Sequence, residues 1–234
     1  MRRLTPLLTV AALLVATQAS AADAPATRRF DVAGFRQVDL RGSDNVVIRV
    51  GPAFSVIATG PGPVLETMTA ELRGDTLRIG HQGKNWNWRK TGVATVTVTL
   101  PALTGVAVSG SGDMSVAPLR TARFSGAVAG SGNLRLARVE AEQVDLSVAG
   151  SGNLIAAGRT GRATLSIAGS GNLDAAALDA TTLSASVAGS GDLLSRASGT
   201  ASTSIAGSGD ITVHGAARCT VSKLGSGDVR CNVG

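Results

Sequence analysis

Aliphatic residues alternate with small polar residues through most of the second half of this chain, on both sides of a recurring Gly-Ser-Gly motif. Counted from the first glycine of a motif, aliphatic residues stand two positions before it and four after it, as Val148 and Leu154 do around Gly150. A period of two is typical of a β-strand, whereas an α-helix requires a period of 3.6. The pattern therefore predicts an all-β fold with a strand on each side of every motif.

Seven copies of the motif follow one another at intervals of 18 to 20 residues. Their first glycines are Gly110, Gly130, Gly150, Gly169, Gly189, Gly207 and Gly225. Repeats of this length indicate a solenoid, in which each coil packs only on its neighbours. Each copy then adds a strand to a parallel sheet about 4.8 Å above the preceding one. The sequence therefore predicts a parallel β-helix with coils of 18 to 20 residues.

The Gly-Ser-Gly motifs are predicted to form the corners between the two strands of a coil, because glycine adopts positive φ without steric cost. Asn or Asp follows each motif and can bond to the local backbone. The Asn members are Asn133, Asn153 and Asn172. Stacked amides can hydrogen-bond to one another, whereas stacked carboxylates repel unless they are solvated or paired with cations. Asp192, Asp210 and Asp228 are therefore a candidate for weak, incidental calcium binding, and no other cofactor is expected.

Small hydroxyl side chains occupy a second set of positions, three and five residues before the first glycine and so on the strand face opposite the aliphatic residues. The most regular members are Thr164, Ser166, Ser184, Ser186, Ser202, Ser204, Thr220 and Ser222. A flat hydroxyl array suits contact with ice or a crystalline polymer, and small outward side chains also permit close lateral packing of two molecules. The sequence leaves both interpretations open, beside that of a plain surface.

The first 21 residues resemble an export signal rather than part of the fold. A basic start at Met1–Arg3 precedes an apolar run from Leu7 to Ala16 and the small residues Ala19-Ser20-Ala21. This order is typical of a secretory signal peptide, and its apolar run is too short to span a membrane. The mature protein is expected to be exported, with the periplasm favoured over the cell surface or the medium, and to lack a transmembrane segment.

Residues 22–29 are expected to form a short disordered leader and residues 30–234 a single domain. Within this domain, residues 30–107 are predicted to form less regular coils, and residues 108–234 the repeat coils. Strand-like runs in the first part cover residues 38–40, 45–50, 55–58, 76–81 and 94–100. The tripeptide Arg73-Gly74-Asp75 is explained by a hairpin turn.

Both tryptophans of the chain lie in an insertion over residues 83–90. Exposed indoles can stack on sugar rings, and nearby cations can meet acidic glycans or lipid headgroups. The candidate ligand-binding residues are Lys84, Trp86, Trp88, Arg89 and Lys90. The alternative is that the two rings cover the first coils and seal the core.

The two cysteines, Cys219 and Cys231, lie six residues before and six after Gly225. An exported protein meets an oxidising compartment, so a disulfide that closes the last coil is expected. Two buried free thiols are the alternative.

The remaining composition argues against several classes of function. Without Arg2 and Arg3, 20 basic residues face 16 acidic ones, a net charge of +4, and no basic block suggests nucleic-acid binding. The only histidines, His81 and His214, belong to no nucleophile or metal motif that the sequence reveals. We therefore expect no catalytic residues.

Several segments, GFRQVDLRGSDNVVI, ELRGDTLRI and PALTGVAVSGSGDMSV, precede the serial GSGN and GSGD corners. Together they resemble the putative auto-transporter adhesin head GIN domain family of bacterial exported proteins. The resemblance implies a right-handed parallel β-helix and an envelope location, for a family whose biochemical function is unknown.

These observations favour a non-catalytic, exported binding module for a glycan or another envelope polymer. A polysaccharide-active enzyme is one alternative, and it predicts a cleft with converging carboxylates. A structural protein that associates laterally through its hydroxyl face is the other. The oligomeric state is left open.

Overall fold

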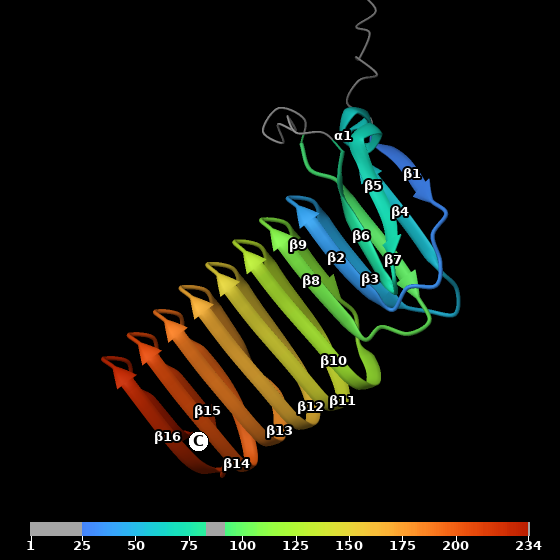
Figure 1. Cartoon of the computed structure of the whole chain (residues 1–234). Coiled ribbons are helices and arrows are strands. Elements are labelled where there is room, and N and C mark those ends of the chain that lie inside the picture. The colour runs from blue at the N-terminus through green and yellow to red at the C-terminus, as the bar shows by residue number, and fades with distance from the viewer. Residues whose placement is uncertain (1–24, 83–91, 234) are drawn as a thin grey trace, which may run out of the picture.

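The computed structural model describes residues 25–82 and 92–233 and confirms the predicted parallel β-helix (Figure 1). Within these residues, seventeen hydrogen-bonded strands form one continuous sheet that winds around the core. The strands of the repeat region are β8 (Gly105–Gly110), β9 (Asp113–Val116), β10 (Leu119–Gly130), β11 (Asn133–Gly150), β12 (Asn153–Gly169), β13 (Asn172–Gly189), β14 (Leu193–Gly207), β15 (Ile211–His214), β16 (Arg218–Gly225) and β17 (Val229–Val233).

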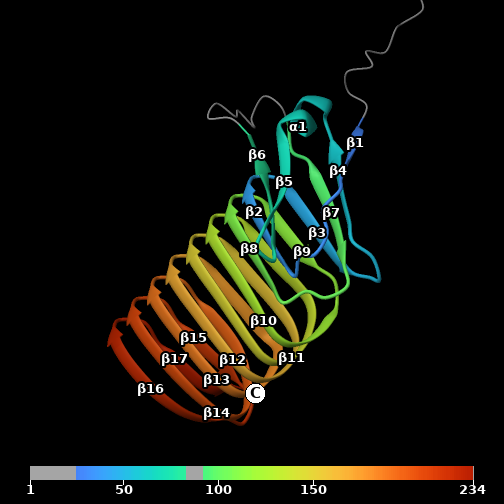
Figure 2. The same ribbon diagram turned by 45° about the vertical axis from the view of Figure 1, so that its right-hand side comes forward.

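Equivalent residues of successive coils lie directly above one another. Gly130 pairs with Gly150, and Val128 with Val148, in the parallel register of β10 and β11. Both valines are buried, because alternate side chains of a strand point into the coil. The stacked coils align their corners along one edge of the molecule (Figure 2).

The N-terminal part contains the predicted strands and additional elements. Its elements are β1 (Ala26–Phe30), β2 (Gln37–Gly42), β3 (Asn45–Val50), β4 (Ser55–Gly60), α1 (Gly62–Thr67), β5 (Met68–Arg73), β6 (Thr76–His81) and β7 (Thr95–Leu100). Strands β2 and β3 stack on β8 and β9, while β6 and β7 pair in parallel with the other edges of β2 and β3. Although β6 and β7 follow β3 in sequence, they therefore precede it in the stack.

Two expectations for this part are corrected. Residues 26–29, expected to belong to a disordered leader, lie in β1, which pairs antiparallel with β4. The region is also only partly coiled, because β4 pairs antiparallel with β7, and β5 forms a hairpin with β6 through Gly74 at φ 63°. An uncovered end coil would expose unpaired backbone groups, and these antiparallel strands cover that end of the stack.

In one column of the core, the side chains become smaller toward the last coils. Four residues before the corner, Leu146, Leu165, Ala185 and Thr203 are in register and buried. The Thr203 hydroxyl donates a hydrogen bond to the carbonyl oxygen of Thr220 in the next coil (3.3 Å). The core therefore accepts a polar residue here because the neighbouring coil satisfies it.

The last described coil is closed by the predicted disulfide between Cys219 and Cys231, whose Cα atoms are 6.5 Å apart. Both cysteines are half-buried against the core. In the same coil, Lys223 is in register with the buried Ile205. A lysine on an exposed strand edge discourages pairing with the edge of another molecule.

Candidate functional site

The two glycines of each corner serve different physical purposes. The first has positive φ in all seven copies, with a value of 122° at Gly150. The second has no room for a side chain: a Cβ on Gly152 would lie 2.2 Å from the carbonyl oxygen of Gly132 and 2.7 Å from Val128 Cγ1. The backbone atoms of one corner are therefore in direct contact with those of the corner in the preceding coil.

The asparagines of the corners form the predicted amide ladder. Its bonds run from Asn133 Nδ2 to Asp113 Oδ1 (2.7 Å), from Asn153 Nδ2 to Asn133 Oδ1 (2.9 Å) and from Asn172 Nδ2 to Asn153 Oδ1 (3.2 Å). Each side-chain amide donates a hydrogen bond to the preceding coil, so the first residue of the ladder needs only an acceptor. A carboxylate is a hydrogen-bond acceptor without a donor, which explains why Asp113 stands at this end.

The next corners carry aspartate, and here backbone N–H groups replace the missing amide donors. Asp210 N donates to Asp192 Oδ1 (3.2 Å), and Asp228 N donates to Asp210 Oδ1 (2.8 Å). Lys223 Nζ lies 3.2 Å from Asp228 Oδ1. The carboxylates thus accept hydrogen bonds from the following coil and do not merely repel one another.

Asp192, Asp210 and Asp228 are the residues of the candidate calcium site. Within residues 25–82 and 92–233, no three His, Cys, Asp or Glu side chains gather closely enough to hold a metal. The described contacts give these carboxylates a structural role at the corners, and calcium binding there stays a prediction.

The hydroxyl positions form an outward face along the stack, here called the hydroxyl face and comprising Thr164, Ser166, Ser184, Ser186, Ser202, Ser204, Thr220 and Ser222. All of them are exposed except the half-buried Ser166. Two hollows lie on this side. The N-terminal hollow, about 280 Å³, includes Gln37, Asp39 and Asp145, and the C-terminal hollow, about 630 Å³, includes Arg162 and Arg218. Thr164 lines both, so the hollows are neighbours along the face.

Charges alternate in sign along another corner of the stack. The register of β10 to β14 aligns Arg120, Glu140, Arg159, Asp179 and Arg196, here called the alternating charge column. Arg120 forms an ion pair with Glu140, and Arg196 Nε lies 3.7 Å from Asp179 Oδ1. Opposite charges on adjacent strands stabilise one register over others, so this column helps to align the coils.

Acid should remove the contribution of Glu140 to stability. A hydrogen bond from Arg120, with a smaller effect from Arg138, lowers the pKa of Glu140 below its ordinary value. Because the pKa is lower in the folded state, ionised Glu140 stabilises the folded protein at pH values above the pKa of the unfolded chain, about 4.3. This stabilisation is lost as the pH falls through the pKa of the folded state. We expect Glu140→Gln to unfold at lower urea concentration than the natural chain at pH 7, and the difference to vanish in acid. Glu142→Gln is the control, since the Glu142 side chain has no ion pair within the described residues; an equal loss in both variants would contradict the prediction.

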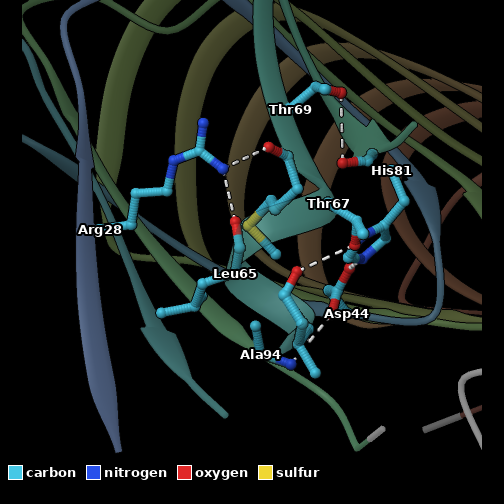
Figure 3. A network of polar contacts seen from close by, with 10 residues as sticks. Arg28, Asp44, Leu65, Thr67, Thr69, His81 and Ala94 are labelled. Carbon is cyan, nitrogen blue, oxygen red and sulfur yellow. Dashed lines mark hydrogen bonds and ion pairs between the residues drawn. The ribbon is translucent and has the colours of Figure 1, made fainter. Parts of the chain in front are cut away.

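A buried polar cluster joins the first coil to the strands that cover it (Figure 3). His81 Nε2 lies 2.5 Å from Asp44 Oδ2, and His81 Nδ1 lies 2.9 Å from Thr67 Oγ1. The side chains of His81 and Asp44 are only 6% and 4% exposed. The other carboxylate oxygen, Asp44 Oδ1, accepts a hydrogen bond from Ala94 N (2.9 Å).

A row of hydroxyl, imidazole and carboxylate can activate a nucleophile. The contacts here instead favour a structural role, in which the cluster acts as a clamp that holds α1 and the neighbouring segments on the first coil. The Thr67 hydroxyl also donates to the carbonyl oxygen of Val64 within α1 (3.1 Å), and the imidazole is buried. Nearby, Arg28 Nη1 donates to the carbonyl oxygens of Leu65 (2.5 Å) and Met68 (3.0 Å), so β1 is tied to the end of α1 (Figure 3). The cluster thus fixes α1 and its neighbours on the first coil.

The sequence signal for this cluster is a departure from the corner motif. Gly42 is in register with Gly110, so Asp44 takes the place of the second glycine, Gly112. A side chain is tolerated at Asp44 because no Gly-Ser-Gly corner precedes it. The carboxylate instead meets His81 and Ala94, which flank residues 83–91.

The candidate residues Lys84, Trp86, Trp88, Arg89 and Lys90 lie outside the described residues, so their role stays a prediction. The structure does describe the two ends of their segment. Gln82 N donates to the carbonyl oxygen of Thr67 (2.9 Å), and Ala94 N donates to Asp44. Both ends are therefore held by the buried cluster.

Within residues 25–82 and 92–233, no helix has the length and apolar character that crossing a bilayer requires.

Comparisons with known proteins give a family and several structural relatives. The model of the family described as "Putative auto-transporter adhesin, head GIN domain" matches residues 34–217. A putative adhesin from Bacteroides fragilis is 23% identical, with 89% of this chain and 97% of that chain covered and a TM-score of 0.82. A putative lipid binding protein from Parabacteroides distasonis is 22% identical, with coverages of 88% and 96% and a TM-score of 0.70. At these identities the likeness shows the fold alone, and no curated protein matches the chain.

Proposed function

This chain belongs to the family of the putative auto-transporter adhesin head GIN domain, and on that premise we propose that it is a non-catalytic, adhesin-like module exported to the cell envelope or surface. Its proposed ligand is an extended glycan or a similar envelope polymer. The disulfide between Cys219 and Cys231 supports an oxidising location outside the cytoplasm.

The hydroxyl face carries this proposal. Its Ser and Thr residues recur in register from coil to coil, for example Thr164, Ser184, Ser202 and Thr220. Hydroxyls both donate and accept hydrogen bonds, and their spacing of about 4.8 Å runs along the stack. An extended polymer laid parallel to the axis would meet the same groups at each coil.

The acidic residues of the N-terminal hollow support binding rather than hydrolysis. Asp39 and Asp145 line the N-terminal hollow. Asp39 Oδ2 accepts a hydrogen bond from Arg41 Nε (2.9 Å), and Asp145 Oδ2 accepts one from Gln143 Nε2 (3.0 Å). Each carboxylate is thus engaged by a neighbour, whereas a glycosidase needs two carboxyl groups directed at one bond.

A glycan array that includes purified envelope polysaccharides tests the proposal. We expect the natural chain to bind, Ser184→Tyr to lose binding because the ring fills the hydroxyl face, and Leu194→Tyr to bind normally. Leu194 is exposed on a different face, so it controls for added bulk. Absence of binding by the natural chain, or equal binding by both tyrosine variants, would refute the proposal. Unchanged binding by the double variant Trp86→Ala, Trp88→Ala would exclude the indoles from the site.

A further inference from the structure

Two arginines without an ion pair or side-chain hydrogen bond among the described residues, Arg162 and Arg218, line the C-terminal hollow. Both side chains are exposed. None of the residues that line this hollow is Asp or Glu, so the two positive charges are not balanced within it. In the N-terminal hollow, by contrast, Asp39 is paired with Arg41 and with Arg78, whose Nε lies 3.5 Å from Asp39 Oδ2.

The register fixes the spacing of the two guanidinium groups along the stack. Arg162 is aligned with Thr182, Thr182 with Thr200, and Thr200 with Arg218. The arginines are therefore three coils apart, about 14 Å at a strand spacing of about 4.8 Å. The hydroxyls of Thr182 and Thr200 lie between them, and those of Ser184 and Ser202, two residues along the same strands, also line the hollow.

We infer that the C-terminal hollow binds an acidic oligosaccharide with uronic-acid units, whose carboxylates pair with Arg162 and Arg218. Arginine forms two parallel hydrogen bonds to a carboxylate, and the hydroxyls between the arginines match the hydroxyl groups of the sugar rings. This inference rests on the proposed function and assigns its ligand a charge and a place. No aromatic ring lines the hollow, and single-stranded nucleic acid, which binds by base stacking, fits it poorly.

Calorimetric titration with oligogalacturonate tests the inference, and the methyl-esterified oligomer supplies the same chain without its charges. We expect the natural chain to bind the acidic oligomer at least about tenfold more tightly than the ester, because hydrogen bonds between charged groups are worth about a factor of ten each. Arg162→Gln and Arg218→Gln should each weaken binding of the acidic oligomer about tenfold. Circular dichroism melting curves of these exposed-site variants should match that of the natural chain.

The single variant Arg135→Gln is the matched control, because it removes the same single charge from a different outward face. Equal weakening by this control, equally tight binding of the ester, equal binding of single-stranded DNA, or no binding of the acidic oligomer would each overturn the inference. The proposed function can hold even if this inference fails. That outcome would be recognised if Ser184→Tyr abolished binding to a neutral glycan while Arg162→Gln and Arg218→Gln bound the same glycan normally.

Discussion

Gly152→Ala is expected to lower the free energy of unfolding by about 3 kcal/mol or more. The added methyl group would lie 2.2 Å from the carbonyl oxygen of Gly132, and the strand register leaves that backbone no room to move. Relief would require the two coils to separate, which would break hydrogen bonds such as that from Gly152 N to the carbonyl oxygen of Gly130 (2.9 Å). Urea denaturation followed by circular dichroism measures the loss.

Gly62→Ala is the matched control for this substitution. A Cβ at Gly62 would have no heavy atom within 4 Å, and the residue lies at the start of α1. Its stability should therefore stay close to that of the natural chain. A loss below about 1 kcal/mol in Gly152→Ala would show that the corners are not held at backbone contact.

Asp44→Ala is expected to cost about 3 kcal/mol, because it removes one partner of a buried pair. His81 Nε2 and Ala94 N would both lose the carboxylate that they contact. Hydrogen exchange should also accelerate at the amides of Gln82 and Ala94, the two ends of the segment held by the buried cluster. Urea denaturation and exchange measured by mass spectrometry check the two effects.

Asp44→Asn retains an oxygen that can accept from Ala94 N, so it should be less damaging than Asp44→Ala. Asp31→Ala, at an exposed position without a described side-chain contact, controls for the loss of a carboxylate. If Asp44→Ala and Asp31→Ala unfolded at the same urea concentration, the cluster could not be a clamp.

The repeat region could be predicted because each coil repeats one local pattern in register with its neighbours. The inward valines and the corner glycines follow directly from a period of two and from the need for positive φ. The parallel β-helix follows from the repeat and is confirmed. The family resemblance and the disulfide are also confirmed, the first from segments that precede the serial corners and the second from the presence of two cysteines in a protein expected to be exported.

The N-terminal part departs from that pattern, and its contacts could not be deduced from local sequence. Strands β6 and β7 stack before β2 and β3, although they follow them in the chain. The contact between Asp44 and His81 spans 37 residues and depends on that reversed order. The alignment of Arg162 with Arg218, by contrast, follows from the repeat, because each stands seven residues before the first glycine of its motif.

The alternating charge column limits how a solenoid of this kind can change its length. Duplicating one coil between Glu140 and Asp179 would place like charges on adjacent strands, whereas duplicating two would preserve the order of signs. As far as this column is concerned, adding or removing coils in even numbers would keep opposite charges on adjacent strands, whereas a single added coil would not.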